Sequence, residues 1–428
     1  MSNNSDVIVH KNKVYLVIDL KTFYASVECV ERNLDPFSTN LVVADPSRGK
    51  GGICLAITPA MKMLGIKNRC RLYEIPPNVE YMVALPRMQK YIDYSAKIYA
   101  IYLKYISKDD IYPYSIDECF LDVTNYLKAY KMNGLALAKI IIKDIFDTYG
   151  ITATCGIGTN MYLAKVALDI MSKHNVTNIG WLNEERYKKE LWHHKPLTDF
   201  WQIGNGIEKR LNRMRLFDMY DIAHCDESRL YKAFGVNAEF LIDHSKGIET
   251  CTIEDIKKYK PKSNSISSSQ VLFQDYEYSK ARLVLKEMVE ILSQRLISEK
   301  KLTGGIKLYI GYSKDMLKAI SASKRLSYFT NQYSKLVFEF LDVFDKHVDK
   351  NVPIRRIGIS FDRLEDDDNE QLDLFQSIEE KNKEKQIEKT IIEIKSKLGK
   401  NAIIKGMNLE EGATTLIRNQ LIGGHNGY

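Results

Sequence analysis

The chain has 428 residues, of which 45% are hydrophobic and 27% are charged, with 23 glycines and 10 prolines. At roughly 100 to 200 residues per domain, this length predicts two to four domains and excludes a single small core. The composition is that of a globular protein and excludes an intrinsically disordered chain.

Membrane insertion and secretion are not expected. The longest apolar stretches are short or interrupted by a charge, as residues 135–142 are by Lys139, whereas a transmembrane helix needs about 20 apolar residues. Residues 1–12 are polar and lack the apolar core of a signal peptide, so we expect a cytoplasmic protein. The seven cysteines are scattered without a C-x-x-C pair, which argues against a disulfide framework and a zinc site.

Positive charge is concentrated in one part of the chain. Residues 257–363 contain 21 Lys and Arg against 11 Asp and Glu, a net charge of +10. Residues 1–256 have a net charge of +1 and residues 364–428 a net charge of −4. A segment this basic predicts a surface for a polyanion, with nucleic acid as the first candidate. Ordinary solvated lysines are the alternative.

The first part of the chain alternates strand and helix patterns. Residues 14–18 predict a buried strand with Asp19 at its end, followed by apolar residues at helical spacing. Residues 41–44 predict a strand that leads into a small basic insertion. Further on, the pattern predicts helices over 88–106, 135–149 and 160–171 and strands over 114–124 and 151–157. Without the insertion, this order is typical of an α+β fold, an elaborated ferredoxin-like sheet with helices on one face.

Residues 174–254 change to short helical patterns rich in Trp, Lys and His. Within them, Ile203-Gly-Asn-Gly-Ile207 precedes a helical pattern over 208–214 and resembles the hairpin of a helix-hairpin-helix element. Gly204 and Gly206 would let main-chain N–H groups approach a phosphate without a Cβ in the way. Most Gly-x-Gly segments, however, are only turns.

A second β-α-β-β-α-β pattern follows a tether at residues 257–264. It predicts strands over 265–273, 305–312, 318–326 and 354–361 and helices over 280–297 and 333–348. This pattern lies on the basic segment, so a sheet face could follow the groove of a nucleic acid. An acidic break at 365–368 precedes a predicted helix over 378–398, and residues 399–428 show little pattern.

The chemistry is predicted around Asp117 and Glu118, two adjacent acids at the start of a strand. Buried carboxylates are costly unless cations or donors neutralise them. In a ferredoxin-like order the first strand lies near the 114–124 hairpin, so Asp19 could join them. Oxygen ligands without His or Cys suit Mg²⁺ or Mn²⁺, and three acids can hold two ions about 3.5 to 4 Å apart, as in phosphoryl-transfer enzymes. Alone, an acidic dipeptide more often caps a turn or pairs with a lysine.

Three segments carry a specific resemblance: Val17-Ile-Asp-Leu-Lys-Thr-Phe-Tyr-Ala-Ser-Val-Glu28, Tyr114-Ser-Ile-Asp-Glu-Cys-Phe-Leu-Asp-Val123 and Gly156-Ile-Gly-x-Asn-x-x-Leu-Ala-Lys-Val-Ala167. Their order and spacing closely resemble the Y-family translesion DNA polymerases over residues 14 to about 375. The end of the chain resembles the UmuC-like, UvrX-type branch of Gram-positive bacteria and their mobile elements.

The resemblance implies templated transfer of nucleotides from dNTPs to a primer 3′ hydroxyl on DNA. It also implies a palm (1–38 and 86–173), fingers (39–85), a thumb with the helix-hairpin-helix (174–256), a little finger that binds DNA (257–363) and a tail (364–428). Lesion specificity, fidelity and the origin of the gene are left open, as is the need for a UmuD-like accessory protein.

Site residues follow by position in the motifs. Asp19 and Asp117 would bind both Mg²⁺ ions, which Mn²⁺ could replace, Glu118 would bind the ion at the primer hydroxyl, and Leu20 would add a main-chain carbonyl. Tyr24 matches the steric gate, the ring that clashes with a ribose 2′ hydroxyl. Phe23 and Tyr24 open a helix whose N–H groups could hold phosphates, and Lys165 matches the triphosphate lysine. Outside the motifs, Tyr24 would equally be a core aromatic and Lys165 a solvated lysine.

Two departures from the family pattern concern the triphosphate and the first motif. Pro59 and Lys62 stand where many relatives have a tyrosine and an arginine, so a hydroxyl is lost and a bidentate fork becomes a point charge. We still expect Lys62 to contact the nucleotide. Lys21 stands where many members have an acid, at a position outside the three metal carboxylates.

Gln371-Leu-Asp-Leu-Phe375 closely resembles the peptide by which bacterial polymerases dock on the sliding clamp. An extended segment would place Leu374 and Phe375 in an apolar pocket and Gln371 against polar groups, while Leu372 and Asp373 complete the motif. An acidic tether would raise the effective concentration of the polymerase at the clamp.

Two other functions remain open. A clamp-bound regulator that has lost catalysis would gain nothing from uncompensated acids near DNA phosphates. A cyclase or another nucleotidyltransferase on a similar palm would leave the basic second sheet and the clamp peptide unexplained.

Overall fold

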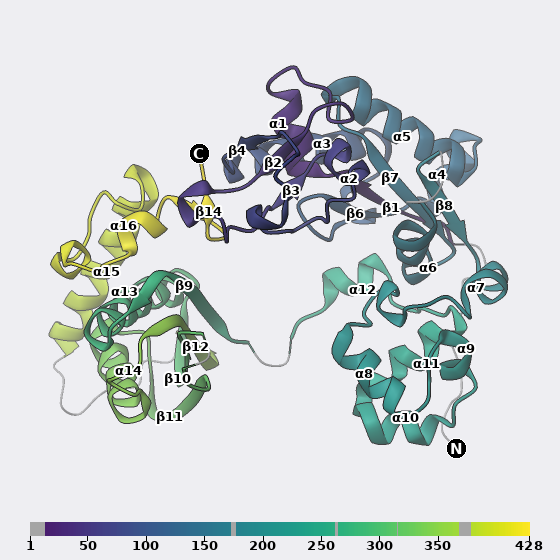
Figure 1. Ribbon diagram of the computed structural model, residues 1–428. Coiled ribbons are helices and arrows are strands. Elements are labelled where there is room, and N and C mark those ends of the chain that lie inside the picture. Colours follow the sequence, from purple (N-terminus) through teal and green to yellow (C-terminus); the bar gives the residue numbers. More distant parts are fainter. Residues whose placement is uncertain (1–12, 173–176, 262–263, 315, 368–377) are drawn as a thin grey trace. The chain divides into compact units, whose positions relative to one another are not determined.

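The computed structural model describes residues 13–172, 177–261, 264–314, 316–367 and 378–428 (Figure 1). The chain forms two compact units, the first ending at Tyr259 and the second beginning at Lys260. Among the described residues, no helix is long and apolar enough to cross a membrane.

The first unit is built on a five-stranded sheet with the order β5-β6-β1-β7-β8. The strands are β1 (Tyr15–Leu20), β5 (Ile111–Pro113), β6 (Glu118–Asp122), β7 (Ala153–Gly158) and β8 (Ile179–Leu182). The central strand β1 pairs antiparallel with both β6 and β7, and its side chains from Tyr15 to Ile18 are at most 2% exposed. Because both faces of β1 are covered, the strand reads as a continuous apolar run.

Helices cover both faces of this sheet rather than the single face predicted from the pattern. On one face lie α3 (Met88–Tyr105) and α5 (Gly134–Tyr149), which contact each other, and this part of the chain also contains α1 (Phe23–Val30) and α4 (Thr124–Tyr130). The start of α5 lies against Leu16 and Ile157. In contrast, α6 (Met161–Val166) packs on Tyr15 and Val17, which point to the opposite face. The side chain of Asp19, two residues after Val17, points to this second face.

The hairpin before β6 differs from the predicted strand over 114–124. Residues 114–117 form its turn, in which the N–H groups of Tyr114 and Ser115 donate to the carbonyl of Glu118. Pro113 ends β5, which is an edge strand and can therefore accommodate a residue that has no N–H to donate.

The insertion forms a small separate core. Its three-stranded sheet has the order β3-β2-β4, with β2 (Leu41–Val43), β3 (Ala56–Ile57) and β4 (Met82–Ala84), and carries α2 (Pro59–Met63). Residues 177–259 add short helices around a second apolar cluster. They are α7 (Glu184–Leu191), α8 (Asn205–Arg213), α9 (Met219–Ala223), α10 (Glu227–Phe234), α11 (Ala238–Lys246) and α12 (Ile253–Lys258).

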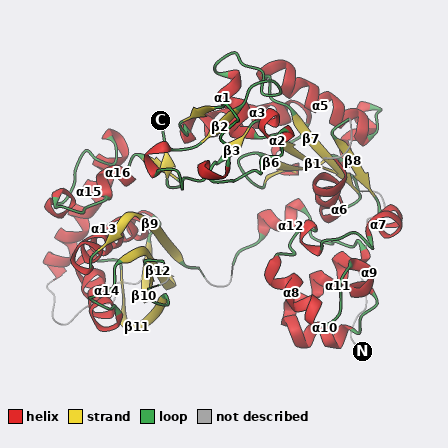
Figure 2. Ribbon diagram, in the orientation of Figure 1, coloured by secondary structure: helices red, strands yellow, loops and turns green. Residues whose placement is uncertain are grey.

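The second unit contains a four-stranded antiparallel sheet with the order β11-β10-β12-β9. Its strands are β9 (Ile266–Tyr276), β10 (Lys301–Tyr312), β11 (Ile320–Thr330) and β12 (Ile354–Asp366). Two helices, α13 (Tyr278–Ser298) and α14 (Tyr333–His347), cover one face and share its core (Figure 2). The predicted β-α-β-β-α-β order is confirmed, and the other face of the sheet is left polar.

The C-terminal segment packs on α13 instead of extending away from it. It comprises α15 (Ile378–Leu398), α16 (Thr415–Arg418) and a hairpin of β13 (Leu421–Ile422) with β14 (His425–Asn426). The carboxylate of Glu287, 1% exposed, accepts hydrogen bonds from Asn408 Nδ2 (3.0 Å) and from the N–H groups of Thr414 (2.7 Å) and Thr415 (3.2 Å). A buried carboxylate thus fastens this segment to α13.

Candidate active site

Strand pairing brings the three predicted acids together where β1 ends and β6 begins. Asp19 lies directly opposite Glu118 in the antiparallel pairing of β1 with β6. The N–H of Leu20 donates to the carbonyl of Asp117 at 2.9 Å. Residues directly opposite each other in a sheet place their side chains on the same face. The main chain of Asp19 is therefore adjacent to those of Asp117 and Glu118, although about a hundred positions separate them in sequence.

Glu118 is a largely buried carboxylate that Lys165 neutralises. Lys165 Nζ donates to Glu118 Oε2 at 3.1 Å and lies 2.9 Å from Oε1, which has no hydrogen-bond partner of acceptable geometry among the described residues. Burial raises the pKa of Glu118 above its ordinary value, although Lys165 acts in the opposite direction. An oxygen that is buried and poorly satisfied can accept a further cation.

Glycines of the third motif allow Lys165 to come this close. A Cβ on Gly156 would lie 2.0 Å from the carbonyl oxygen of Ala164, and one on Gly158 would lie 2.1 Å from the N–H nitrogen of the same residue. Only glycine permits α6 to lie directly on β7 at these two positions. The side chain of Asn160 caps α6 by accepting from the N–H of Leu163 at 2.8 Å. The motif therefore fixes the helix that carries Lys165.

Asp169 belongs to this cluster and was missed by the sequence prediction. It lies on a π-helical turn, Ala167–Met171, directly after α6, and its Oδ2 is 2.9 Å from Lys165 Nζ. Burial would lower the pKa of Lys165, but the carboxylates of Asp169 and Glu118 outweigh it and the pKa is raised. The i, i+4 spacing from Lys165 was the available signal, yet such spacing alone is common on solvated helices.

The acids have the chemistry for a divalent ion but are not gathered around one point. Among the described residues, no three Asp, Glu, His or Cys side chains lie close enough together to hold a metal ion. Carboxylate oxygens near a main-chain carbonyl suit Mg²⁺ or Mn²⁺. The donor set fits, and the carboxylates would have to turn toward a common point for an ion to bind.

Helix α1 places Phe23 and Tyr24 in its first turn, next to the end of β1. The first intrahelical acceptor is the carbonyl of Thr22, which takes the N–H of Ser26, so the amides of Phe23 and Tyr24 precede the hydrogen-bonded part of the helix. Burial and the nearby carboxylate of Asp117 raise the pKa of the half-buried Tyr24. Tyr24 therefore lies near Asp117.

Tyr24 stacks on Tyr91 of α3, a contact that the sequence prediction missed. The ring centroids are 4.4 Å apart with an interplanar angle of 16°. The Tyr91 hydroxyl donates to Glu28 Oε1 at 2.8 Å, and Arg87 holds both oxygens of Glu28, at 3.0 and 2.7 Å. Glu28 ends the first motif, but Arg87 and Tyr91 lie about sixty residues away from it, and local patterns could not identify them as its partners.

The predicted fingers residues lie on a short helix of the insertion. Pro59 occupies the first turn of α2, where a residue without an N–H costs nothing, and Lys62 lies in the last turn. The contact of Lys62 with the nucleotide stays a prediction. Lys21, at the other position that departs from the family pattern, donates from Nζ to Asn178 Oδ1 at 2.5 Å.

The glycine hairpin predicted over 203–207 is wrong in its details. Gly204 is the N-cap of α8, with an ordinary φ of −93°, and Gly206 lies inside the helix, which begins at Asn205 rather than Glu208. A Cβ at either glycine would meet nothing within 4 Å. No contact within the described chain therefore requires glycine at either position. The missing Cβ would matter only for a ligand that approaches the main chain closely.

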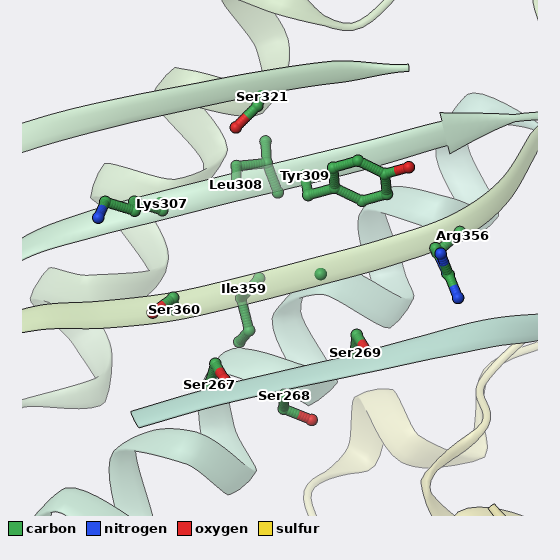
Figure 3. A pocket seen from close by; sticks show the side chains of 11 residues that line it. Ser267, Ser268, Ser269, Lys307, Leu308, Tyr309, Ser321, Arg356, Ile359 and Ser360 are labelled. Carbon is green, nitrogen blue, oxygen red and sulfur yellow. The ribbon is translucent and has the colours of Figure 1, made fainter. Parts of the chain in front are cut away.

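The polar face of the second sheet forms a shallow hollow of about 500 Å³ (Figure 3). Lys307, Tyr309 and Arg356 are exposed there, while the positions between them on three strands are mostly short: Ser267, Ser269, Ser321, Gly358 and Ser360. Short side chains keep the hollow open, and basic and hydroxyl groups supply donors. The Gln371–Phe375 motif lies outside the described residues.

Two family models match the chain. The impB/mucB/samB family model matches residues 18–169, and the model of the C-terminal domain of that family matches residues 263–374. The first match contains the acids, Tyr24 and Lys165. The second contains the basic sheet and ends before α15.

Curated relatives match nearly the whole chain. UvrX of Bacillus subtilis (strain 168), named as a provisional UV-damage repair protein, is 33% identical over 96% of this chain and 97% of its own length. DNA polymerase IV 2 of the same organism is 32% identical over 97% of this chain and 99% of its own length. A solved Y-family DNA polymerase chimera of Dbh and Dpo4 superposes with a TM-score of 0.63 at 22% identity, covering 82% of this chain and 98% of the chimera.

Proposed function

Because the chain belongs to the impB/mucB/samB family of Y-family DNA polymerases, we propose that it extends primers opposite damaged template bases by metal-dependent nucleotide transfer. The observation that carries this proposal is the direct pairing of Asp19 with Glu118, with Asp117 hydrogen-bonded to Leu20 beside them. No apolar packing requires three acids at that edge, and divalent ions would compensate them.

Asp19 and Asp117 would hold two Mg²⁺ ions, with Glu118 and the carbonyl of Leu20 completing the ligands. When bound, the ions would lower the pKa of the primer hydroxyl and neutralise charge on the phosphate. Lys165 compensates Glu118 in the free protein, and it would exchange this partner for the triphosphate once a nucleotide arrives. The ammonium group of Lys165 thus offsets the charge of the largely buried Glu118 until substrate binds.

Nucleotide selection would depend on the first turn of α1. The N–H groups of Phe23 and Tyr24 would donate to phosphate oxygens at the positive end of the helix. The ring of Tyr24 would occupy the space that a ribose 2′ hydroxyl needs. Lys62 on α2 would add a single positive charge to the triphosphate in place of a guanidinium fork.

DNA would be held through its backbone by separate parts of the chain. We assign residues 1–38 and 86–173 to the palm, 39–85 to the fingers, 174–256 to the thumb and 257–363 to the little finger. The start of α8, with Gly204 and Gly206, would approach a phosphate in the thumb, and the hollow with Lys307 and Arg356 would do so in the little finger. Short hydroxyl and basic side chains are typical phosphate donors that carry no sequence preference.

The Gln371–Phe375 motif would tether the enzyme to the sliding clamp. Replacing Leu374 and Phe375 by alanine should abolish binding to the bacterial β clamp in a pull-down, whereas replacing Lys397 and Lys400, also in the tail, should not. Retention of clamp binding by the first variant would remove the motif from this role.

Primer extension opposite an undamaged base, an abasic site and a bulky adduct, in Mg²⁺ and then Mn²⁺, tests the proposed function. We expect insertion opposite at least one lesion. Extension only on undamaged template would contradict the translesion role. Failure to incorporate any dNTP with either ion would instead favour the alternative, a regulator that occupies primer ends without catalysis.

A further inference from the structure

We propose that Tyr91, anchored by Glu28 and Arg87, is a positioning residue that fixes the ring of Tyr24 and thereby sets discrimination between deoxyribonucleotides and ribonucleotides. This inference rests on the proposed role of Tyr24 as the steric gate. It adds a second layer, contributed by α3, behind the ring that meets the sugar.

The ring of Tyr24 has an extended flat support. Tyr91 lies nearly parallel to it, at a centroid separation of 4.4 Å, close to the shortest separations of stacked aromatic pairs. Phe23 is a weaker neighbour, tilted by 46° at 5.8 Å. The face of Tyr24 that turns toward α3 is therefore occupied by Tyr91.

Tyr91 is itself immobilised. Its side chain is 0% exposed, and its hydroxyl donates to Glu28 Oε1 at 2.8 Å. Burial, together with the carboxylate of Glu28, raises the pKa of Tyr91, so the hydroxyl keeps its proton and remains a donor. The ring is thus held in plane by packing and at its end by a charge-assisted hydrogen bond.

Glu28 is held in turn by two arginines. Arg87 donates from Nε and Nη2 to the two carboxylate oxygens at 3.0 and 2.7 Å, and Arg32 pairs with Oε2 one helical turn away. Burial would raise the pKa of Glu28, but the hydrogen bonds from Arg87, Tyr91 and Arg32 lower it, so the carboxylate stays charged. The ion pair between Arg87, just before α3, and Glu28, on α1, therefore fixes the position of one helix relative to the other.

This arrangement matters because a steric gate works only if its ring cannot retreat. A hydroxyl group is small, and a gate that yields by a fraction of an ångström would accommodate it. A ring backed by solvent or a flexible chain can yield, whereas a ring stacked on a buried, anchored Tyr91 cannot. The rigidity of Tyr91 is thus expected to appear as sugar selectivity.

The test compares kcat/KM for a dNTP and the matching rNTP in the full-length protein with primer-template and Mg²⁺. Tyr91→Leu removes the stacked ring, and we expect the rNTP to dNTP ratio to rise about three- to tenfold. Tyr91→Phe keeps the ring but loses the bond to Glu28, and we expect a rise of about twofold. Tyr24→Ala, which removes the gate, should give the largest rise.

Tyr94 provides the matched control. It lies one turn further along α3, donates to Glu31 Oε1 at 2.8 Å and packs against Tyr149. Tyr94→Leu and Tyr94→Phe should leave the ratio unchanged. The double variant Tyr24→Ala/Tyr91→Leu should match Tyr24→Ala alone, because Tyr91 acts only through Tyr24.

The outcomes separate this inference from the proposed function. If Tyr24→Ala raises the ratio but Tyr91→Leu does so no more than Tyr94→Leu, the inference is overturned and the gate stands. Should Tyr91→Leu not fold, a Tyr91→Phe ratio equal to that of Tyr94→Phe overturns it. If Tyr24→Ala leaves the ratio unchanged, the proposed gate and the inference are both wrong. The proposed polymerase function would still stand, because it does not depend on the gate.

Discussion

Lys165 Nζ lies 2.9 Å from Glu118 Oε1 and 2.9 Å from Asp169 Oδ2, so one ammonium group bridges two carboxylates from different elements. Only 9% of the Lys165 side chain is exposed. Removing one partner of a buried ion pair is costly, because the other partner is left as an uncompensated charge. Any group that binds Glu118 would therefore compete with Lys165, and Lys165 would be released to face the substrate.

Replacing Lys165 by methionine should weaken nucleotide binding. The variant retains the volume of the side chain but loses the charge, and we expect KM for dNTP to rise about tenfold or more, since a charge-assisted bond to phosphate is lost. Steady-state primer extension measures this. Asp169→Asn is the comparison, because it keeps the ammonium group, and its KM should rise less. Equal KM values for Lys165→Met and the wild type would exclude a contact with the triphosphate.

Glu28→Gln should destabilise the first unit in a pH-dependent manner. The pKa of Glu28 is lowered from its ordinary value of 4.5 in the folded state, so its contribution to stability is present above pH 4.5 and is lost as the pH falls through the folded pKa. Removing the charge from this buried network should cost about 3 kcal/mol at pH 7, measured by denaturant unfolding.

The difference between Glu28→Gln and the wild type should narrow below pH 4.5. Glu31→Gln is the control, since Glu31, the residue directly after α1, pairs with Lys90 at 2.5 Å but is 24% exposed, and the substitution should cost less than about 1 kcal/mol. A constant difference from pH 7 to pH 4 would show that the charge of Glu28 contributes nothing.

Glu287→Ala should release the C-terminal segment from α13. The substitution leaves the buried N–H groups of Thr414 and Thr415 without an acceptor, at about 1 to 3 kcal/mol for each unsatisfied group. Limited proteolysis should then cleave within residues 399–428 faster than in the wild type. Glu299→Ala, an exposed change just after the same helix, should not alter cleavage.

Lys307→Ala and Arg356→Ala should weaken DNA binding uniformly across sequences. Each should reduce the slope of log K against log salt by about one, because one phosphate contact is lost. Fluorescence anisotropy with two unrelated primer-templates at several salt concentrations measures this. Lys350→Ala, in the loop before β12, is the control. An unchanged slope in both sheet variants would place the DNA elsewhere.

Local patterns predicted the elements well where periodicity and burial agree. The strand over 14–18 corresponds to Tyr15–Leu20 and the helix over 88–106 to Met88–Tyr105. The meeting of Asp19 with Asp117 and Glu118 was also predictable, because strand order in a ferredoxin-like sheet decides which strand ends are neighbours. The turn over 114–117 was not, since its residues alternate like a strand.

Contacts between distant residues escaped prediction. Glu28 reads as one polar residue on a helix, and only the packing of α3 on α1 shows that Arg87 and Tyr91 hold it. Residues 399–428 have no periodicity because their order comes from bonds to Glu287, more than a hundred positions earlier, rather than from an apolar face. Such polar, long-range anchoring leaves little signal in a local pattern.

The Mg²⁺-dependent primer-extension rate of Asp117→Ala, compared with Asp109→Ala, is decisive for the metal site. Asp109 is an exposed acid in the turn directly before β5. We expect Asp117→Ala to bind primer-template like the wild type but to lose at least about a thousandfold in rate, and Asp109→Ala to retain full activity. Extension by Asp117→Ala at the wild-type rate would show that Asp19, Asp117 and Glu118 do not form the catalytic centre.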